Sequence, residues 1–271
     1  MAEPADDRKH RAVAVYEAIA NSYDSIRFTQ VAAHRLVELV TPYQGARVLD
    51  VATGSGWAAL AAARCVGATG SVLGIDLATG LLERARQKAR DAGLKNVEFQ
   101  EADGDHLGFP DQSFDIALCS LALFYFPDML AALRGWRRLL VPGGQVGFSW
   151  WGPSFRQPLS DLWRSRLEKF GVVLPTQPNQ TLRQPDTCRR LLNEAGFTQV
   201  RVRNEQLGYY FNTIDEYWAE VMASVFGFRI KQLDPASREQ FKTEHLAEVE
   251  ALATADGIWA DSSTNFAFGR K

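Results

Sequence analysis

The stretch RVLDVATGSGWAAL, residues Arg47–Leu60, decides the fold of this 271-residue chain. The apolar residues Val48, Leu49 and Val51 predict a short strand, and the alanine-rich segment after the turn Gly54–Gly56 predicts a helix. Glycines in a turn of this kind let the backbone pass close to a ligand. The stretch therefore predicts a strand, a glycine turn and a helix that together bind a small molecule.

Asp50 separates two classes of ligand for this turn. The two glycines followed by Ala59 also fit the dinucleotide-binding fingerprint, which makes a nicotinamide-dependent oxidoreductase one hypothesis. A dinucleotide would bring an anionic pyrophosphate close to the Asp50 carboxylate, four residues before Gly54. S-adenosylmethionine (SAM) instead carries an ammonium and a sulfonium group, which a carboxylate attracts. Asp50 therefore favours SAM.

Two more acidic residues follow the next predicted strands. Asp76 ends the apolar segment 71–75, about 20 residues beyond the glycine turn, where a carboxylate can accept both hydroxyls of a ribose. Asp103 follows the predicted strand 97–100 and is placed to accept the adenine amino group, with the Gly104 backbone at the ring edge. We expect Asp76→Ala to weaken SAM binding sharply and to leave the fold intact.

Further predicted strands at 114–120 and 145–150, the second preceded by the turn Pro142–Gly144, complete the pattern. With the three acidic residues in this order, the chain resembles the class I SAM-dependent methyltransferases. Within them it resembles the methyltransferase type 11-like branch, which includes quinone-biosynthesis enzymes and many small-molecule methyltransferases. The resemblance covers residues 12–150. It implies an α/β fold with a Rossmann-like seven-stranded sheet, mostly parallel with an antiparallel last strand, and helices on both faces.

The resemblance also implies which residues bind the cofactor. Those expected around the methionine part of SAM are Asp50, Ala52, Gly54 and Gly56. Those expected at the nucleoside are Asp76 and Leu77 for the ribose, and Asp103 and Gly104 for the adenine. Ser120 would face the cofactor from the end of the fourth strand. Tyr23 lies in a segment that resembles one closing over the cofactor in this branch, and its alternative role is packing between two helices.

The acceptor side of the methyl group is predicted to be aromatic. Many members of the family carry histidine in the loop after the fourth strand, where this chain has Phe124 and Tyr125. Tyr125 is the candidate catalytic residue, and it would orient the acceptor more readily than remove a proton, because an unperturbed phenol is a poor base at neutral pH. Its alternative role is a core aromatic. The other residues expected at the acceptor are Tyr16, Phe124, Trp150 and Trp151.

The chain is predicted to fold as one domain over residues 1–271, with two helical insertions that form a cap over the strand ends. The aromatic residues of these insertions favour an apolar acceptor. Thr198–Phe211 is predicted as one continuous strand, and Thr79–Ala92 as a helix with a solvent-exposed basic face. The N-terminal helices are placed at 1–42 and the cap insertions at 153–196 and 212–257.

Composition narrows the range of partners. A formal net charge of -2 provides no basic surface for a phosphate backbone, so nucleic acid is not an expected partner. Three scattered cysteines favour reduced thiols and a cytoplasmic location. No apolar run reaches the roughly 18 residues of a membrane span, and isolated histidines argue against a metal site. The oligomeric state is left open, with a homodimer among the states considered.

The expected activity is methyl transfer from SAM to an O, N or C atom of an apolar or aromatic small molecule. Because the positive charge on sulfur disappears as the methyl group leaves, an apolar enclosure and good positioning favour the reaction, and a strong base is optional. C-methylation of a quinone precursor is one alternative. A SAM-binding protein that uses the cofactor structurally is a second, and a modifier of protein or nucleic acid is disfavoured by the net charge.

Overall fold

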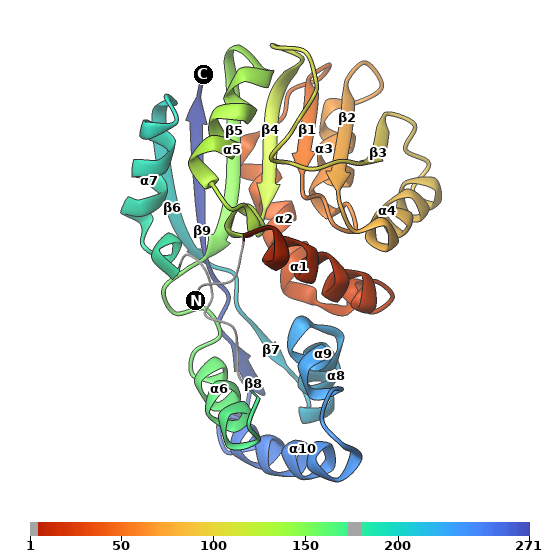
Figure 1. The fold of residues 1–271 in the computed structure, drawn as a ribbon, viewed down its shortest axis with the longest axis vertical. Helices are drawn as coiled ribbons and strands as arrows, with labels where there is room; N and C mark the ends of the chain where they lie inside the picture. The colour runs from red at the N-terminus through yellow and green to blue at the C-terminus, as the bar shows by residue number, and fades with distance from the viewer. Residues whose placement is uncertain (1–4, 173–179) are drawn as a thin grey trace.

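A seven-stranded sheet forms the centre of the computed structural model, which describes residues 5–172 and 180–271 (Figure 1). The strand order is β3-β2-β1-β4-β5-β9-β6. Strands β1 to β5 run parallel to one another, whereas β9 runs antiparallel to both β5 and β6, which confirms the predicted Rossmann-like sheet. The strands are β1 (Arg47–Val51), β2 (Ser71–Asp76), β3 (Val97–Glu101), β4 (Phe114–Ser120), β5 (Leu140–Trp151), β6 (Thr198–Gln206) and β9 (Ser263–Arg270).

Helices cover both faces of this sheet because successive side chains of a strand point to opposite faces. In β1, Val48 packs into the core formed with α2, α3 and α4, whereas Leu49 packs into the core formed with α5 and α7. Residues 48–51 are all buried, as expected of a parallel strand that is covered on both faces. The helices are α2 (Arg27–Val40), α3 (Trp57–Val66), α4 (Thr79–Asp91), α5 (Met129–Leu139) and α7 (Pro185–Glu194).

The prediction of one strand over Thr198–Phe211 is wrong at its C-terminal end. β6 ends at Gln206, and the residues that follow pair in a separate two-stranded sheet. A Cβ on Gly208 would lie 2.3 Å from the Trp259 ring, so glycine is required at this bend. Val200 and Val202 stand at even positions, whereas Tyr209 and Phe211 stand at odd positions, so the alternation changes phase at the bend and one continuous strand does not fit it. The two short strands are β7 (Tyr209–Phe211) and β8 (Ile258–Ala260).

A second, mainly helical lobe faces the carboxyl ends of the parallel strands, and we call it the cap (Figure 1). It consists of α6 (Leu159–Lys169), β7, α8 (Ile214–Ala223), α9 (Val225–Ile230), α10 (Pro235–Glu250) and β8. The predicted insertions 153–196 and 212–257 supply these helices, apart from residues 173–179, which lie outside the described part of the chain. The predicted insertion 153–196 also includes α7, but in the structure α7 packs on the sheet through Cys188 and Leu192.

The N-terminal helix α1 (Ala5–Ile19) crosses the strand ends between the sheet and the cap (Figure 1). Glu17 of this helix accepts hydrogen bonds from the Gly80 amide, at 3.0 and 3.1 Å, and so joins α1 to the first turn of α4. The short helix η1 (Tyr23–Ser25) then leads into α2. No helix among residues 5–172 and 180–271 is long and apolar enough to cross a bilayer.

Candidate active site

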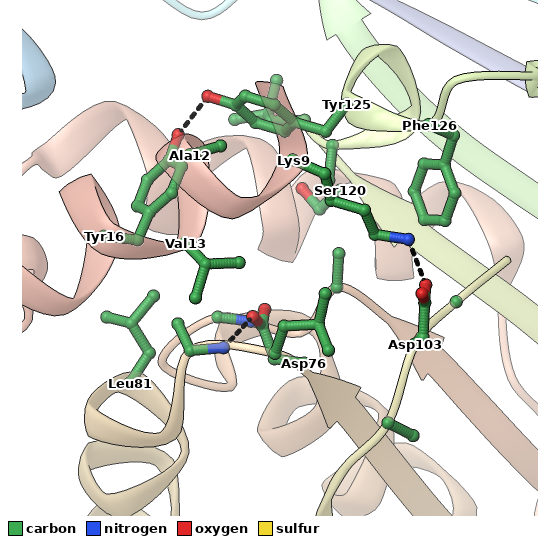
Figure 2. Close-up of a pocket in the computed structure, with 18 of the residues that line it drawn as sticks. Lys9, Ala12, Val13, Tyr16, Asp76, Leu81, Asp103, Ser120, Tyr125 and Phe126 are labelled. Atoms are coloured by element: carbon green, nitrogen blue, oxygen red, sulfur yellow. Dashed lines mark hydrogen bonds and ion pairs between the residues drawn. The ribbon is translucent and has the colours of Figure 1, made fainter. Parts of the chain in front are cut away.

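A pocket lies at the carboxyl ends of β1, β2 and β4, beneath α1, where ligands bind in open α/β sheets (Figure 2). Eight of the ten residues predicted to bind the cofactor line it: Tyr23, Ala52, Gly54, Asp76, Leu77, Asp103, Gly104 and Ser120. Tyr16 and Tyr125, predicted on the acceptor side, line it as well. The sequence interpretation missed Lys9 and Val13, which α1 contributes to the same pocket.

Asp50 does not line the pocket. Its side chain is buried beneath the glycine turn, where one carboxylate oxygen accepts hydrogen bonds from the Thr53 hydroxyl and, at 3.0 Å, from the Ala59 amide. Burial raises the pKa of Asp50 to about 7. The predicted contact with the methionine part is therefore corrected, because in this structure Asp50 fixes the turn and the start of α3 from below.

The two glycines of the turn are required for different reasons: Gly54 lies at the pocket surface, and Gly56 lies in tight packing beneath it. Gly54 has a φ of 55°, and a Cβ there would lie 3.7 Å from the Tyr23 ring, at the pocket surface. Gly56 has a φ of 85°, and a Cβ there would lie 2.9 Å from the Ala85 side chain and 3.1 Å from the Phe99 ring. Gly56 thus permits close packing of the turn against α4 and β3, and it does not line the pocket.

Asp76 supports the turn and faces the pocket at the same time. One carboxylate oxygen accepts a hydrogen bond of 2.8 Å from the Gly54 amide, and the other accepts one of 2.9 Å from the Ala78 amide. Burial raises the pKa of Asp76, and the two amide hydrogen bonds oppose this shift. Each oxygen of a carboxylate has two lone pairs, so one on each remains for a ribose hydroxyl.

Asp103 and Gly104 form the far end of the pocket. Asp103 accepts a hydrogen bond from the Asp105 amide at 3.1 Å and makes an ion pair with Lys9. A Cβ on Gly104 would lie 2.7 Å from the Phe126 ring, so glycine lets the backbone pass close to this ring, which also lines the pocket. The ion pair with Lys9 joins residues 94 positions apart, and no local sequence signal indicates it.

The candidate catalytic residue Tyr125 lies in the short helix η2 (Leu123–Tyr125), after β4. Its hydroxyl lies 2.6 Å from the Tyr16 hydroxyl of α1 (Figure 2). Burial raises the pKa of both tyrosines, which disfavours a phenolate at neutral pH. The Tyr16 ring also makes an edge contact with the Tyr23 ring, at 5.9 Å between centroids. The pair can therefore hold an acceptor by hydrogen bonds and is a poor proton acceptor.

The three remaining residues predicted at the acceptor do not line the pocket. Phe124 and Trp150 are buried, and their ring centroids lie 4.1 Å apart. Trp151 stacks on Trp150 on one side and on Phe155 on the other, with an interplanar angle of 4° to Phe155. These rings form a packed layer behind Tyr125. The predicted contact with the acceptor is therefore corrected, because in this structure the three rings pack against one another and against Phe155.

A cluster of charges fixes the glycine turn from the side away from the pocket. Asp24 accepts hydrogen bonds from the Ser55 hydroxyl at 2.6 Å, from Lys88 at 2.8 Å and from Arg84 at 3.0 Å. Lys88 also lies 3.5 Å from the centroid of the Trp57 ring. The prediction that the basic face of α4 is solvated is therefore wrong for Arg84 and Lys88, which connect η1 to the turn.

The donors and acceptors of the pocket fit SAM. Asp76 can accept from ribose hydroxyls and Asp103 from an amino group, while Leu81, Ala102 and Phe126 offer apolar surface to a purine. The described residues hold no group of three or more His, Cys, Asp or Glu side chains that could bind a metal ion. The cavity measures about 100 Å³, below the roughly 300 Å³ at which small-molecule pockets begin.

Comparison with known proteins gives the family. The ubiE/COQ5 methyltransferase family matches residues 5–175. The chain is 31% identical to the nocamycin O-methyltransferase of Saccharothrix syringae, over 94% of this chain and 97% of that protein. It is 35% identical to the aklanonic acid methyltransferase DauC of Streptomyces sp. (strain C5), over 55% of this chain and 67% of that protein. It is 31% identical to a demethylmenaquinone methyltransferase of Staphylococcus aureus (strain JH9), over 72% and 88%.

Solved structures share the fold. The YcgJ protein of Bacillus subtilis has a TM-score of 0.58 at 19% identity, covering 89% of this chain and 97% of that one. A SAM-dependent methyltransferase of Aquifex aeolicus has a TM-score of 0.53 at 21% identity, covering 70% and 90%. The sheet and its strand-end pocket define the class of SAM-dependent methyltransferases with a Rossmann-like fold. Within that class, the chain belongs to the ubiE/COQ5 methyltransferase family.

Proposed function

We propose that this SAM-dependent methyltransferase acts on an oxygen atom of an apolar or aromatic small molecule, and that this oxygen is acidic, as in a phenol, an enol or a carboxylic acid. The observation that carries the proposal is the set of side chains around the pocket. Its described lining includes no histidine, and burial raises the pKa of Tyr16 and Tyr125. A weakly acidic acceptor would need a base that these side chains do not supply.

Under this proposal, the residues at one end of the pocket bind the cofactor and those at the other end orient the acceptor. SAM, when bound, supplies the activated methyl group. Asp76 would hold the ribose hydroxyls and Asp103 the adenine amino group, which fixes the nucleoside at one end of the pocket. Tyr16 and Tyr125 would orient the acceptor oxygen through their hydroxyls at the other end. Positioning of this kind converts a bimolecular step into an effectively unimolecular one, and exclusion of water removes competing solvation of the sulfonium.

The relatives support an oxygen acceptor and one alternative. The match to nocamycin O-methyltransferase extends over nearly the whole chain, cap included. The match to demethylmenaquinone methyltransferase covers 72% of the chain and supports methylation of a quinone precursor at carbon as the second candidate. We also place the protein in the cytoplasm, where its three free cysteines would stay reduced.

An isotope-labelled methyl group on SAM separates these candidates. The protein is incubated with labelled SAM and a panel of phenols, aromatic carboxylic acids and demethylated quinols, and the products are analysed by NMR. Label in a methoxy group or a methyl ester supports the proposal, whereas label in a ring methyl group supports the quinone alternative. Binding of SAM without label transfer to any acceptor would contradict both and favour a structural use of the cofactor.

A further inference from the structure

Lys9 of α1 occupies the end of the pocket formed by Asp103 (Figure 2). Its ammonium group contacts the Asp103 carboxylate and lies 2.6 Å from Oδ2 of Asp105. Only 15% of the Lys9 side chain is exposed, and its nitrogen lies 5.9 Å from the centroid of the Phe126 ring. The Lys9 ammonium therefore pairs with the Asp103 carboxylate, which under the proposed function binds the adenine amino group.

The ion pair is stable in this arrangement. Burial lowers the pKa of Lys9, but the hydrogen bonds to Asp103 and Asp105 outweigh it and raise the pKa above its ordinary value. Burial likewise raises the pKa of Asp103, and the hydrogen bond from Lys9 helps to hold it below its ordinary value. Both groups are charged at neutral pH, so an incoming amino group must compete with a full ionic interaction.

The pocket also lacks the room to hold the Lys9 side chain and the adenine ring at the same time. Its volume of about 100 Å³ lies below that of an ordinary small-molecule pocket, roughly 300 Å³ or more. Lys9 is a long, flexible side chain near the N-terminal end of α1, whereas the other end of the helix is held by Glu17 on the Gly80 amide and by Tyr16 on Tyr125. Lys9 can therefore withdraw while these two contacts keep α1 in place.

We propose that Lys9 is an internal competitor of the cofactor: its ion pair with Asp103 holds the N-terminal end of α1 against the nucleoside end of the pocket, and Lys9 must leave Asp103 before adenine can bind there. The inference rests on the proposed function, because it takes Asp103 as the partner of the adenine amino group. The inference also bears on how the site discriminates adenine from hypoxanthine. The carbonyl oxygen of hypoxanthine would accept a hydrogen bond from Lys9. Without Lys9, the Asp103 carboxylate would repel that oxygen.

Calorimetry on the full chain tests this competition with two ligands, S-adenosylhomocysteine and its counterpart with hypoxanthine in place of adenine. Lys9→Met keeps the length of the side chain and removes its charge, and we expect it to bind S-adenosylhomocysteine about fivefold more tightly than the wild type. Lys9→Arg keeps the charge and should bind it as the wild type does. The preference for adenine over hypoxanthine should rise in Lys9→Met only.

Hydrogen exchange of α1 in the ligand-free protein is the second measurement. We expect the N-terminal part of α1, around Lys9, to exchange faster in Lys9→Met than in the wild type and Lys9→Arg, because the ion pair no longer holds this end of the helix. Weaker or unchanged binding of S-adenosylhomocysteine by Lys9→Met, or unchanged exchange, would overturn the proposal. If neither protein bound S-adenosylhomocysteine, the proposed function would fail, and the exchange rates would still report on the ion pair.

Discussion

Asp76 shows how one residue can serve the fold and the pocket together. Its two oxygens accept hydrogen bonds from the Gly54 and Ala78 amides, so the same carboxylate that faces the pocket also fixes the glycine turn. The expectation that Asp76→Ala leaves the fold intact is therefore revised. The substitution would leave two buried amides without an acceptor, and each loss of this kind costs about 1–3 kcal/mol.

We expect Asp76→Ala to weaken binding of S-adenosylhomocysteine by more than about tenfold and to lower the free energy of unfolding by about 2–6 kcal/mol, because two amides lose their acceptor. Calorimetry and urea unfolding measure the two effects. Glu101→Gln is the matched control, because Glu101 is the register partner of Asp76 on β3 and is exposed. Unchanged affinity in Asp76→Ala would remove Asp76 from the cofactor site.

At the scale of elements, Asp24 connects η1, the glycine turn and α4. Asp24→Asn would leave Lys88 and Arg84 without their carboxylate and would loosen Ser55 within the turn. We expect the free energy of unfolding to fall by about 1–2 kcal/mol, and the affinity for S-adenosylhomocysteine to fall about tenfold, because a half-buried cation loses its partner. Thermal unfolding and calorimetry measure these changes.

The control for Asp24→Asn lies on α4, the helix that carries Arg84 and Lys88. Glu83 pairs with Arg86 on the exposed side of α4, with 66% of the Glu83 side chain exposed. Glu83→Gln should therefore change stability by less than about 0.5 kcal/mol and leave affinity unchanged. Equal effects of the two substitutions would mean that the Asp24 cluster does not position the turn.

The cap contains a buried histidine that makes its stability depend on pH. Nε2 of His245, on α10, lies 2.7 Å from the Tyr217 hydroxyl, and its ring meets the Trp163 ring edge-on at 5.0 Å. Burial first, and then the charge of Arg166, lowers the pKa of His245 to about 4. The unfolded chain takes up a proton near pH 6.5, so stability from the neutral ring is complete above that pH and is lost as the pH falls toward 4.

This pKa shift corresponds to a loss of about 3 kcal/mol in the free energy of unfolding as the pH falls from above the unfolded pKa to below the folded pKa. Urea unfolding of the wild type and of His245→Gln, measured from pH 7.5 to pH 4.5, checks the prediction, because Gln can still hydrogen-bond to Tyr217 and does not titrate. The wild type should lose more stability on acidification than the variant does. Parallel curves for the two proteins would contradict the assignment.

For the whole molecule, the sequence predicts the sheet and most of the nucleoside end of the pocket. The reason is local: Asp76 and Ser120 end a strand, the glycine turn and Asp103 come just after one, and parallel strands bring their ends to one edge. Asp50 led to the correct cofactor although it lies beneath the turn. The contacts that sequence reasoning missed are long-range, such as Lys9 with Asp103 and Tyr16 with Tyr125, 94 and 109 residues apart.

The pairing of β6 with β9 has a consequence for how such proteins diversify. Gln206 is the register partner of Ser263, so residues 207–262 leave and rejoin the sheet at one pair of neighbouring positions. In topological terms, most of the cap is the greatly enlarged turn of a β-hairpin. Because loop-closure entropy grows only slowly with length, this lobe can be lengthened, shortened or exchanged at little cost to the strands beneath it. The residues that line the strand-end pocket all lie between Lys9 and Phe126, so such a change would leave them in place.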